Sequence, residues 1–221
     1  MMEWIFFDLG STLLDEEEAY SHYVKECVKR LQFLGRDGSF NFYCKKMEEF
    51  ARGGGDPIKE TWNYFAPNEK RPLWTNEGVR LYPVVKEVLE KLSSNYQLGI
   101  IANQSGGVRA LLEDWGVLSY FQLIILSEEI GFTKPDPTIF KLALEKAATS
   151  ADKTIYVGDR YDNDILPAKS LGMRAVRVMT GLGKLGVEDG KWKSDWQIDS
   201  LLELVAMIDS QRQSFEMNCS L

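Results

Sequence analysis

The sequence predicts an α/β fold, in which a doubly wound, Rossmann-like parallel sheet carries an inserted α-helical cap domain. A short apolar run at residues 3–8 ends in one carboxylate, Asp8, and a Gly/Ser turn follows it at once. Residues 18–66 then place their apolar side chains at helical spacing. From Pro83 onward, short apolar runs alternate with helical patterns of about a dozen residues, which is typical of βαβ units and a parallel sheet. One α/β domain is therefore expected to be interrupted, directly after its first strand, by a helical insert.

Local signals divide the insert. The acidic run at residues 15–18 is expected to be a solvated hinge or a first helical turn. Three glycines after Arg52 interrupt the helical pattern. Asp56 and Pro57 restart it, because an N-cap residue followed by proline at the first helical position is a common helix start. Apolar residues at helical spacing support the helices on both sides of this break: Tyr20, Val24, Cys27, Val28, Leu31, Phe42, Met47 and Phe50.

The alternating part is expected to complete the sheet. After a helix that contains residues 84–92, the predicted strands cover residues 96–102, 121–126, 154–157, 174–178 and 196–198, and the predicted helices cover 107–115, 137–148, 164–171 and 199–208. The expected organisation is an α/β core made of residues 1–14 and 82–209, an α-helical cap at 15–81, and a polar, flexible tail at 210–221.

Composition and charge exclude several classes of protein. The 221 residues include 33 acidic and 26 basic side chains, and the net charge of −7 provides no bulk attraction to nucleic acid or to an anionic membrane. No apolar run approaches the roughly 20 residues that span a bilayer, and the chain starts with a core strand rather than a signal sequence. The three cysteines (Cys27, Cys44 and Cys219) lack metal-type spacing and are interpreted as free thiols in a reducing compartment. We therefore expect a cytoplasmic protein, with no nucleic-acid or membrane partner, that is a monomer or a dimer.

Polar side chains follow several of the predicted strands. Asp8 ends the first strand, and Asn103 follows the strand at 96–102. Lys134 precedes a helix, while Asp159 and Asp164 follow the strand at 154–157. The carboxyl ends of parallel strands face one crevice, so these residues are expected to converge although they are far apart in the sequence.

The charges of this group indicate its chemistry. Asp8, Asp159 and Asp164 cannot all be ionised in one crevice without a counterion. Mg²⁺ suits such a site, because it takes a few carboxylates, keeps several waters and binds phosphate. Lys134 adds positive charge, and a cation with a lysine suits a dianionic phosphoryl group, which the backbone amides of the Gly/Ser turn can also face. Asp162 is expected to be a solvated turn residue.

In their order and spacing, these residues resemble the haloacid dehalogenase-like (HAD) hydrolase superfamily, and the helical insert is similar to its α-helical cap. The resemblance implies that Asp8 is the nucleophile, that Asn103 orients the phosphoryl group and that Lys134 neutralises charge. It further implies an Mg²⁺-dependent hydrolase of the phosphatase type, which forms an aspartyl-phosphate on Asp8 and acts on a small phosphorylated metabolite. The metal ligands implied are Asp8, the backbone carbonyl of Gly10, Asp159 and Asp164.

Two positions depart from the phosphatase pattern of that superfamily. Its phosphatases carry a second Asp two residues after the nucleophile, as general acid and base, and here that residue is Gly10. General acid–base catalysis is typically worth about 10²–10⁴ in rate, so esters with poor leaving groups are most affected by its loss. The Ser or Thr that usually ends the second motif's strand is Ala102.

Three alternatives therefore stay open. Haloacid dehalogenase chemistry needs no metal, and the Asp159 and Asp164 motif argues against it. Phosphonate cleavage needs a cap lysine that forms an imine. A catalytically weakened, ligand-binding member would fit Gly10 and Ala102. The candidate cap lysines are Lys25, Lys29, Lys45 and Lys46.

Overall fold

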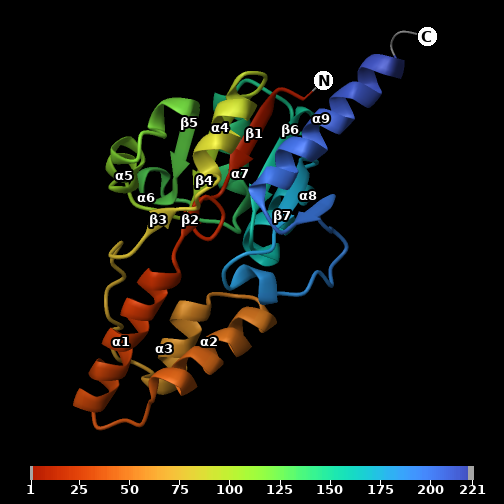
Figure 1. The fold of residues 1–221 in the computed structure, drawn as a ribbon. Helices are drawn as coiled ribbons and strands as arrows, with labels where there is room; N and C mark the ends of the chain where they lie inside the picture. The colour runs from red at the N-terminus through yellow and green to blue at the C-terminus, as the bar shows by residue number, and fades with distance from the viewer. Residues whose placement is uncertain (1, 219–221) are drawn as a thin grey trace.

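A computed structural model describes residues 2–218 and shows one six-stranded parallel sheet with a separate helical body beneath it (Figure 1). The strand order is β5-β4-β1-β6-β7-β8, and every neighbouring pair is parallel. In chain order, β4 and β5 are added on one side of β1, and β6, β7 and β8 are then added on its other side. The strand order therefore reverses between β1 and β6. A sheet of this kind binds ligands at that reversal. The strands are β1 (Trp4–Phe7), β4 (Gln97–Ala102), β5 (Phe121–Leu126), β6 (Thr154–Gly158), β7 (Arg174–Val178) and β8 (Trp196–Ile198).

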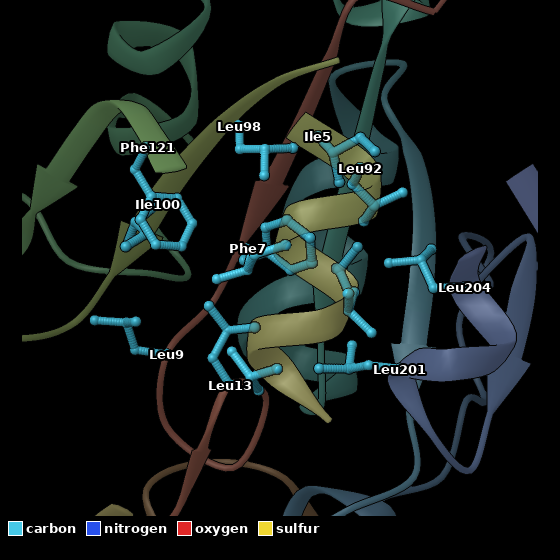
Figure 2. Packing of buried hydrophobic residues seen from close by; sticks show 14 of the residues in the cluster. Ile5, Phe7, Leu9, Leu13, Leu92, Leu98, Ile100, Phe121, Leu201 and Leu204 are labelled. Atoms are coloured by element: carbon cyan, nitrogen blue, oxygen red, sulfur yellow. The ribbon is translucent and has the colours of Figure 1, made fainter. Parts of the chain in front are cut away.

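Helices cover both faces of the sheet, which confirms the predicted doubly wound α/β fold. Ile5 and Phe7 point to the face covered by α4 and α9 (Figure 2), whereas Phe6 points to the face covered by α7 and α8. Burying each such side chain stabilises the fold by about 1.5–3 kcal/mol, so β1 is a rigid support for the residue at its tip. The core helices are α4 (Val85–Ser93), α5 (Val108–Asp114), α6 (Ser127–Ile130), α7 (Pro137–Lys146), α8 (Leu166–Ser170) and α9 (Leu201–Asn218).

The insert forms three helices with an apolar core of their own. Tyr43 and Trp62 are fully buried there among residues from all three helices. Asp56 accepts hydrogen bonds from the amides of Ile58 and Lys59, and Pro57 begins the last helix, as the sequence predicts. The helices are α1 (Glu17–Phe33), α2 (Phe40–Gly53) and α3 (Pro57–Phe65).

Two short strands join the cap to the core. β2 (Leu14–Asp15) pairs antiparallel with β3 (Arg80–Leu81), so the two chain crossings lie side by side. Arg80 Nε donates to Asp15 Oδ2 at 3.0 Å across this pair. The domain boundaries expected from the sequence stay a prediction; the one between residues 14 and 15 lies within β2, and the one between residues 81 and 82 directly follows β3.

Two helical segments differ from the expectation. The segment expected as one helix at 164–171 begins with a π-helical turn at Tyr161–Ile165, in which the Asp164 side chain accepts a hydrogen bond from the Arg160 amide. The last helix continues to Asn218 instead of ending near residue 208, and residues 219–221 of the expected tail lie outside the described residues. Three 3₁₀ turns complete the described elements: η1 (Leu118–Tyr120), η2 (Ala151–Lys153) and η4 (Gly183–Leu185). Within residues 2–218, no helix has the length and apolarity that a bilayer span requires.

Candidate active site

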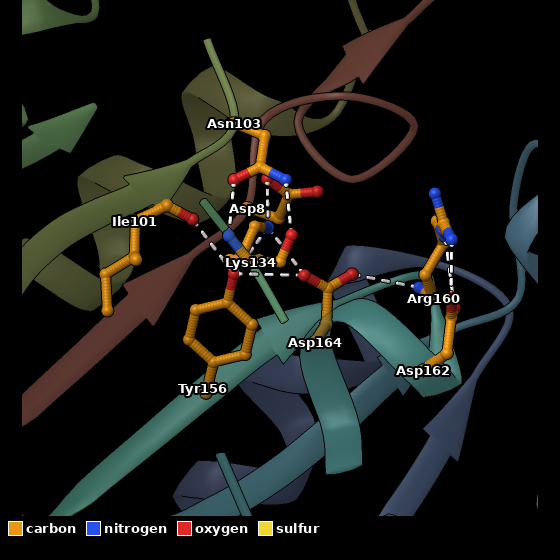
Figure 3. A network of polar contacts seen from close by, with 8 residues as sticks. All are labelled: Asp8, Ile101, Asn103, Lys134, Tyr156, Arg160, Asp162 and Asp164. Carbon is orange, nitrogen blue, oxygen red and sulfur yellow. Dashed lines mark hydrogen bonds and ion pairs between the residues drawn. The ribbon is translucent and has the colours of Figure 1, made fainter. Parts of the chain in front are cut away.

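The polar residues that follow the central strands converge at the crevice between β1 and β6 (Figure 3). Asp8 directly follows β1, and its amide donates to the Val157 carbonyl of β6 at 2.9 Å. Asp159 directly follows β6, and Asp164 lies in the π-helical turn that comes next in the chain. The sheet therefore delivers three carboxylates to one point from two neighbouring strands.

Lys134 lies between two of these carboxylates. Its Nζ is 2.7 Å from Asp8 Oδ1 and 2.6 Å from Asp164 Oδ1, and it donates to the Tyr156 hydroxyl at 2.9 Å. Burial disfavours the charged lysine, but Asp164 and Asp8 outweigh this effect and raise its pKa above the usual value. The lysine is therefore a fixed positive charge beside Asp8.

Asn103 holds the loop that carries this lysine. Its Nδ2 donates to the Lys134 carbonyl at 2.9 Å, and its Oδ1 accepts from the Lys134 amide at 2.7 Å. The structure thus places Asn103 beside the site as a positioning residue for Lys134, whereas the sequence suggested only a contact to the phosphoryl group.

The three carboxylates form a compact, oxygen-only group. One oxygen from each of Asp8, Asp159 and Asp164 lies within 4.8 Å of the others. Burial and the neighbouring Asp164 and Asp8 raise the pKa of Asp159 well above its usual value. Burial also raises the pKa of Asp8 to about 6, against the opposing effect of Lys134. Gly10, the remaining predicted ligand, lies in the turn two residues after Asp8.

A divalent cation fits this group of residues. Lys134 forms ion pairs with Asp8 and Asp164 but not with Asp159, which is 3% exposed and has no ion pair to any residue that the structure describes. A buried carboxylate without a cation is unfavourable, and hard cations prefer carboxylate oxygens. The residues present could therefore hold a metal ion.

Two buried residues that the sequence analysis did not single out support the site. The Tyr156 hydroxyl donates to the Ile101 carbonyl at 2.9 Å and receives the Lys134 hydrogen bond described above. Arg177 is 1% exposed, and its Nε donates to the Asp159 carbonyl at 3.0 Å. The available signal was a charged residue inside the apolar strand at 174–178.

Glycines allow the acidic residues to pack closely. A Cβ atom at Gly158 would lie 2.6 Å from Asp164 Cβ, and one at Gly183 would lie 2.1 Å from Asp159 Oδ2. Any side chain at these two positions would displace a carboxylate of the cluster.

Glu16 is another site residue that the sequence analysis missed, because the acidic run was expected to be solvated. Its side chain is buried, and Ser11 Oγ donates to Glu16 Oε2 at 3.4 Å. Burial, followed by repulsion from Asp8, raises the pKa of Glu16 to about 7. The carboxylate of Glu16 therefore lies beside the turn that follows Asp8.

Two cavities lie between the cap and the core. The larger, of about 730 Å³, extends from the Asp8 turn to α2. The smaller, of about 220 Å³, lies between Asp159 and the loop that joins α2 to α3. The larger cavity is lined by residues that include Ser11, Glu16, Tyr20, Met47, Thr180 and Lys184.

Asp162 joins the core to the cap, which corrects the expectation of a solvated turn residue. Its Oδ2 accepts from the Gly55 amide at 3.0 Å and lies 2.6 Å from Arg160 Nη2. Arg160 also donates to the Gly55 carbonyl. These contacts hold the loop between α2 and α3 against the core.

Comparisons with known proteins agree with this geometry. The family model described as haloacid dehalogenase-like hydrolase matches residues 5–178. A glyceraldehyde 3-phosphate phosphatase from Methanocaldococcus jannaschii is 30% identical over 234 residues, covering 96% of this chain and 100% of that protein. The crystal structure of a HAD phosphatase from Thermococcus onnurineus has a TM-score of 0.68 at 25% identity, over 94% of this chain and 98% of the other. A 2-haloacid dehalogenase from Pseudomonas syringae pv. Tomato DC3000 has a TM-score of 0.61 at 25% identity, over 96% of this chain and 100% of the other.

The chain belongs to the haloacid dehalogenase-like hydrolases, which confirms the family that its motifs indicate. Phosphatases are among the proteins most similar to it in sequence and in structure.

Proposed function

We propose that this hydrolase is an Mg²⁺-dependent phosphatase that acts on a small phosphorylated metabolite through an aspartyl-phosphate on Asp8. The observation that carries the proposal is the setting of Asp8, which lies at the tip of the central strand, 2.7 Å from the Lys134 ammonium and within 4.8 Å of two further carboxylates. Nucleophile, fixed cation and metal-type donors thus meet at one point.

The geometry suggests a role for each side chain. The Asp8 carboxylate attacks phosphorus in line with the leaving oxygen, and water then releases phosphate from the aspartyl-phosphate. Lys134 orients Asp8 and offsets negative charge on the phosphoryl oxygens, while Asn103 keeps Lys134 in place. A bound Mg²⁺, held by Asp8, Asp159, Asp164 and the Gly10 carbonyl, would add the positive charge that lets a dianionic phosphate approach three carboxylates.

The larger cavity, which reaches Ser11 in the turn after Asp8, favours a small substrate. Its volume of about 730 Å³ lies within the 300–1,000 Å³ range that is usual for small-molecule pockets. The Methanocaldococcus jannaschii relative is named for glyceraldehyde 3-phosphate, so short sugar phosphates are the first candidates to test. A substrate of this kind would suit the cytoplasmic location that the sequence predicts.

The contacts around the site give the two chemical alternatives less support. A haloacid dehalogenase has no use for the buried Asp159 and Asp164 pair. None of the four candidate cap lysines lines either cavity described above, and Lys46 is 2.6 Å from Glu49. None of these four cap lysines therefore supports phosphonate cleavage through an imine.

Phosphate release with and without metal tests the proposal. p-Nitrophenyl phosphate and acetyl phosphate have good leaving groups, so they do not depend on the acid that Gly10 lacks. We expect turnover that EDTA abolishes, that Mg²⁺ restores and that Asp8→Asn lowers by at least about 10³-fold, as loss of a nucleophile does. Turnover no higher than that of Asp8→Asn would contradict the phosphatase and favour a ligand-binding role.

A further inference from the structure

The proposed phosphatase reaction, on which this inference rests, needs a proton donor for an alkyl or aryl leaving group. Lys134 is held between Asp8 and Asp164 at 2.7 and 2.6 Å, and it is needed there as a positive charge. Asp159 and Asp164 belong to the metal-type cluster. Gly10, two residues after Asp8, has no side chain. None of these groups is available to protonate the leaving oxygen.

The carboxylate of Glu16 occupies the space beside Gly10 where a side chain would lie. A Cβ atom built on Gly10 would be 2.8 Å from Glu16 Oε2 and 3.1 Å from Oε1. Ser11, the next residue of the same turn, donates its hydroxyl to Oε2 at 3.4 Å. Glu16 of the cap thus places its carboxylate where a side chain at position 10 would lie, although Glu16 is eight residues after Asp8 in the sequence.

Neither helix capping nor an ion pair explains the placement of Glu16, whose side chain bonds to Ser11 of the turn after Asp8. It is the N-cap residue of α1, yet its side chain makes no capping hydrogen bond, and Asp15 Oδ1 accepts from the Glu17 amide at 3.1 Å instead. Among residues 2–210, no cationic side chain lies within ion-pair distance of Glu16. Burying a carboxylate without a cationic partner costs stability, which a functional role would explain.

The connection to the cap fixes where this carboxylate lies. Glu16 directly follows β2, whose pairing with β3 includes the Asp15–Arg80 ion pair at 3.0 Å. The side chain lines the larger cavity together with Tyr20 and Thr180. It therefore faces the space that a substrate leaving group would enter.

We propose that Glu16 is the general acid and general base of this enzyme, in place of a side chain at position 10. In the first step, Asp8 forms a bond to phosphorus, the bond from phosphorus to the leaving oxygen breaks, and that oxygen takes the proton of the Glu16 carboxyl group. In the second step, a water oxygen attacks phosphorus, its proton passes to the Glu16 carboxylate, and the bond from phosphorus to Asp8 breaks. Phosphate leaves, and both carboxyl groups return to their starting forms.

Glu16→Gln tests this role with two substrates that differ in their need for a proton. For phenyl phosphate, whose leaving group needs protonation, we expect kcat/KM to fall by about 10²-fold or more. For acetyl phosphate we expect kcat/KM to change by less than about tenfold, because kcat/KM reports the first step and its leaving group needs no proton. Acid-quenched protein should also retain more covalently bound phosphate, since water attack is slowed. A merely structural role would lower both kcat/KM values alike and leave the retained phosphate unchanged.

An exchange of the carboxylate between the two positions provides the second variant. Gly10 does not lie in the left-handed backbone region, so Asp fits its backbone once Glu16 is shortened. We expect Gly10→Asp with Glu16→Ala to recover at least about tenfold of the phenyl phosphate kcat/KM that Glu16→Ala alone loses. Glu26→Gln, an exposed acid on the same helix, is the matched control and should behave as the wild-type enzyme.

The outcomes separate the two proposals. An active wild-type enzyme whose Glu16→Gln variant keeps full kcat/KM on phenyl phosphate would overturn the role of Glu16 alone. Absence of any turnover that depends on Asp8 in the wild-type protein would overturn this role together with the phosphatase function.

Discussion

Arg177 is the buried residue that ties the Asp159 side of the site to the rest of the core. Its guanidinium donates to the carbonyls of Asp159, Gly183 and Gly186 at 3.0, 2.6 and 2.7 Å, and lies 3.4 Å from Glu188. One side chain thus fixes the backbone of a predicted metal ligand and the loop that packs against it.

Replacing Arg177 with Met is expected to destabilise the protein by about 3 kcal/mol, because Glu188 would be left as a buried charge without its partner. Unfolding in denaturant, followed by circular dichroism, measures this loss. Arg174→Met, at the exposed start of the same strand, should cost less than about 1 kcal/mol. Equal losses of unfolding free energy in the two variants would show that the buried contacts of Arg177 add no stability beyond that of an exposed arginine.

The residues predicted from the sequence and those missed differ in how they reach the site. The positions of Asp8 and Asp159 could be predicted, because residues at the carboxyl ends of neighbouring parallel strands lie at the same edge of the sheet. Glu16 and Tyr156 could not, because their contribution depends on where a side chain turns within a helix start or a strand. The missing side chain at Gly10 was visible in the sequence, but the carboxylate that fills its place belongs to another element.

At the scale of elements, the sequence predicts the strands better than the contacts between cap and core. The strands at 121–126, 174–178 and 196–198 are observed with the predicted bounds, since buried parallel strands are short apolar runs with clear ends. The β2–β3 ribbon escaped prediction because each strand has only two residues. The contact of Asp162 with the cap joins residues 107 positions apart, which local periodicity cannot reveal.

This contact should control how firmly the cap closes. Asp162→Ala removes the acceptor of the Gly55 amide and the partner of Arg160. A partly exposed hydrogen bond of this type contributes about 1 kcal/mol, so we expect KM for the metabolite substrate to rise about fivefold, with a smaller change in kcat. Steady-state kinetics measure both constants. Asp114→Ala, at the exposed end of α5, should change neither, and an unchanged KM for Asp162→Ala would show that the contact does not influence closure.

At the scale of the whole molecule, the cap and the core have separate apolar clusters. They are two bodies that meet at one junction (Figure 1). The sheet brings the acidic residues together, and the ribbon brings Glu16 to them from the cap. Negative charge is concentrated at this junction, where the carboxylates of Asp8, Asp159 and Asp164 lie beside Lys134. Figure 3 shows Lys134 between Asp8 and Asp164. The stability of the molecule should therefore depend on a cation at that point.

We expect Mg²⁺ to stabilise the folded protein through this junction. At a concentration about 100 times its dissociation constant, a ligand that binds only the folded state adds about 2.7 kcal/mol, which corresponds to about 5–10 °C in Tm for a chain of this size. Asp159→Asn should abolish the increase, and in EDTA it should be at least as stable as the wild-type protein, because the neutral amide avoids burying a carboxylate and relieves repulsion from Asp164 and Asp8. Asp114→Asn should keep the full increase. Thermal unfolding with and without Mg²⁺ measures Tm for the wild-type protein and both variants. An equal increase in Tm for Asp159→Asn would show that the stabilising cation binds elsewhere, because this variant lacks one of the carboxylate ligands at the junction.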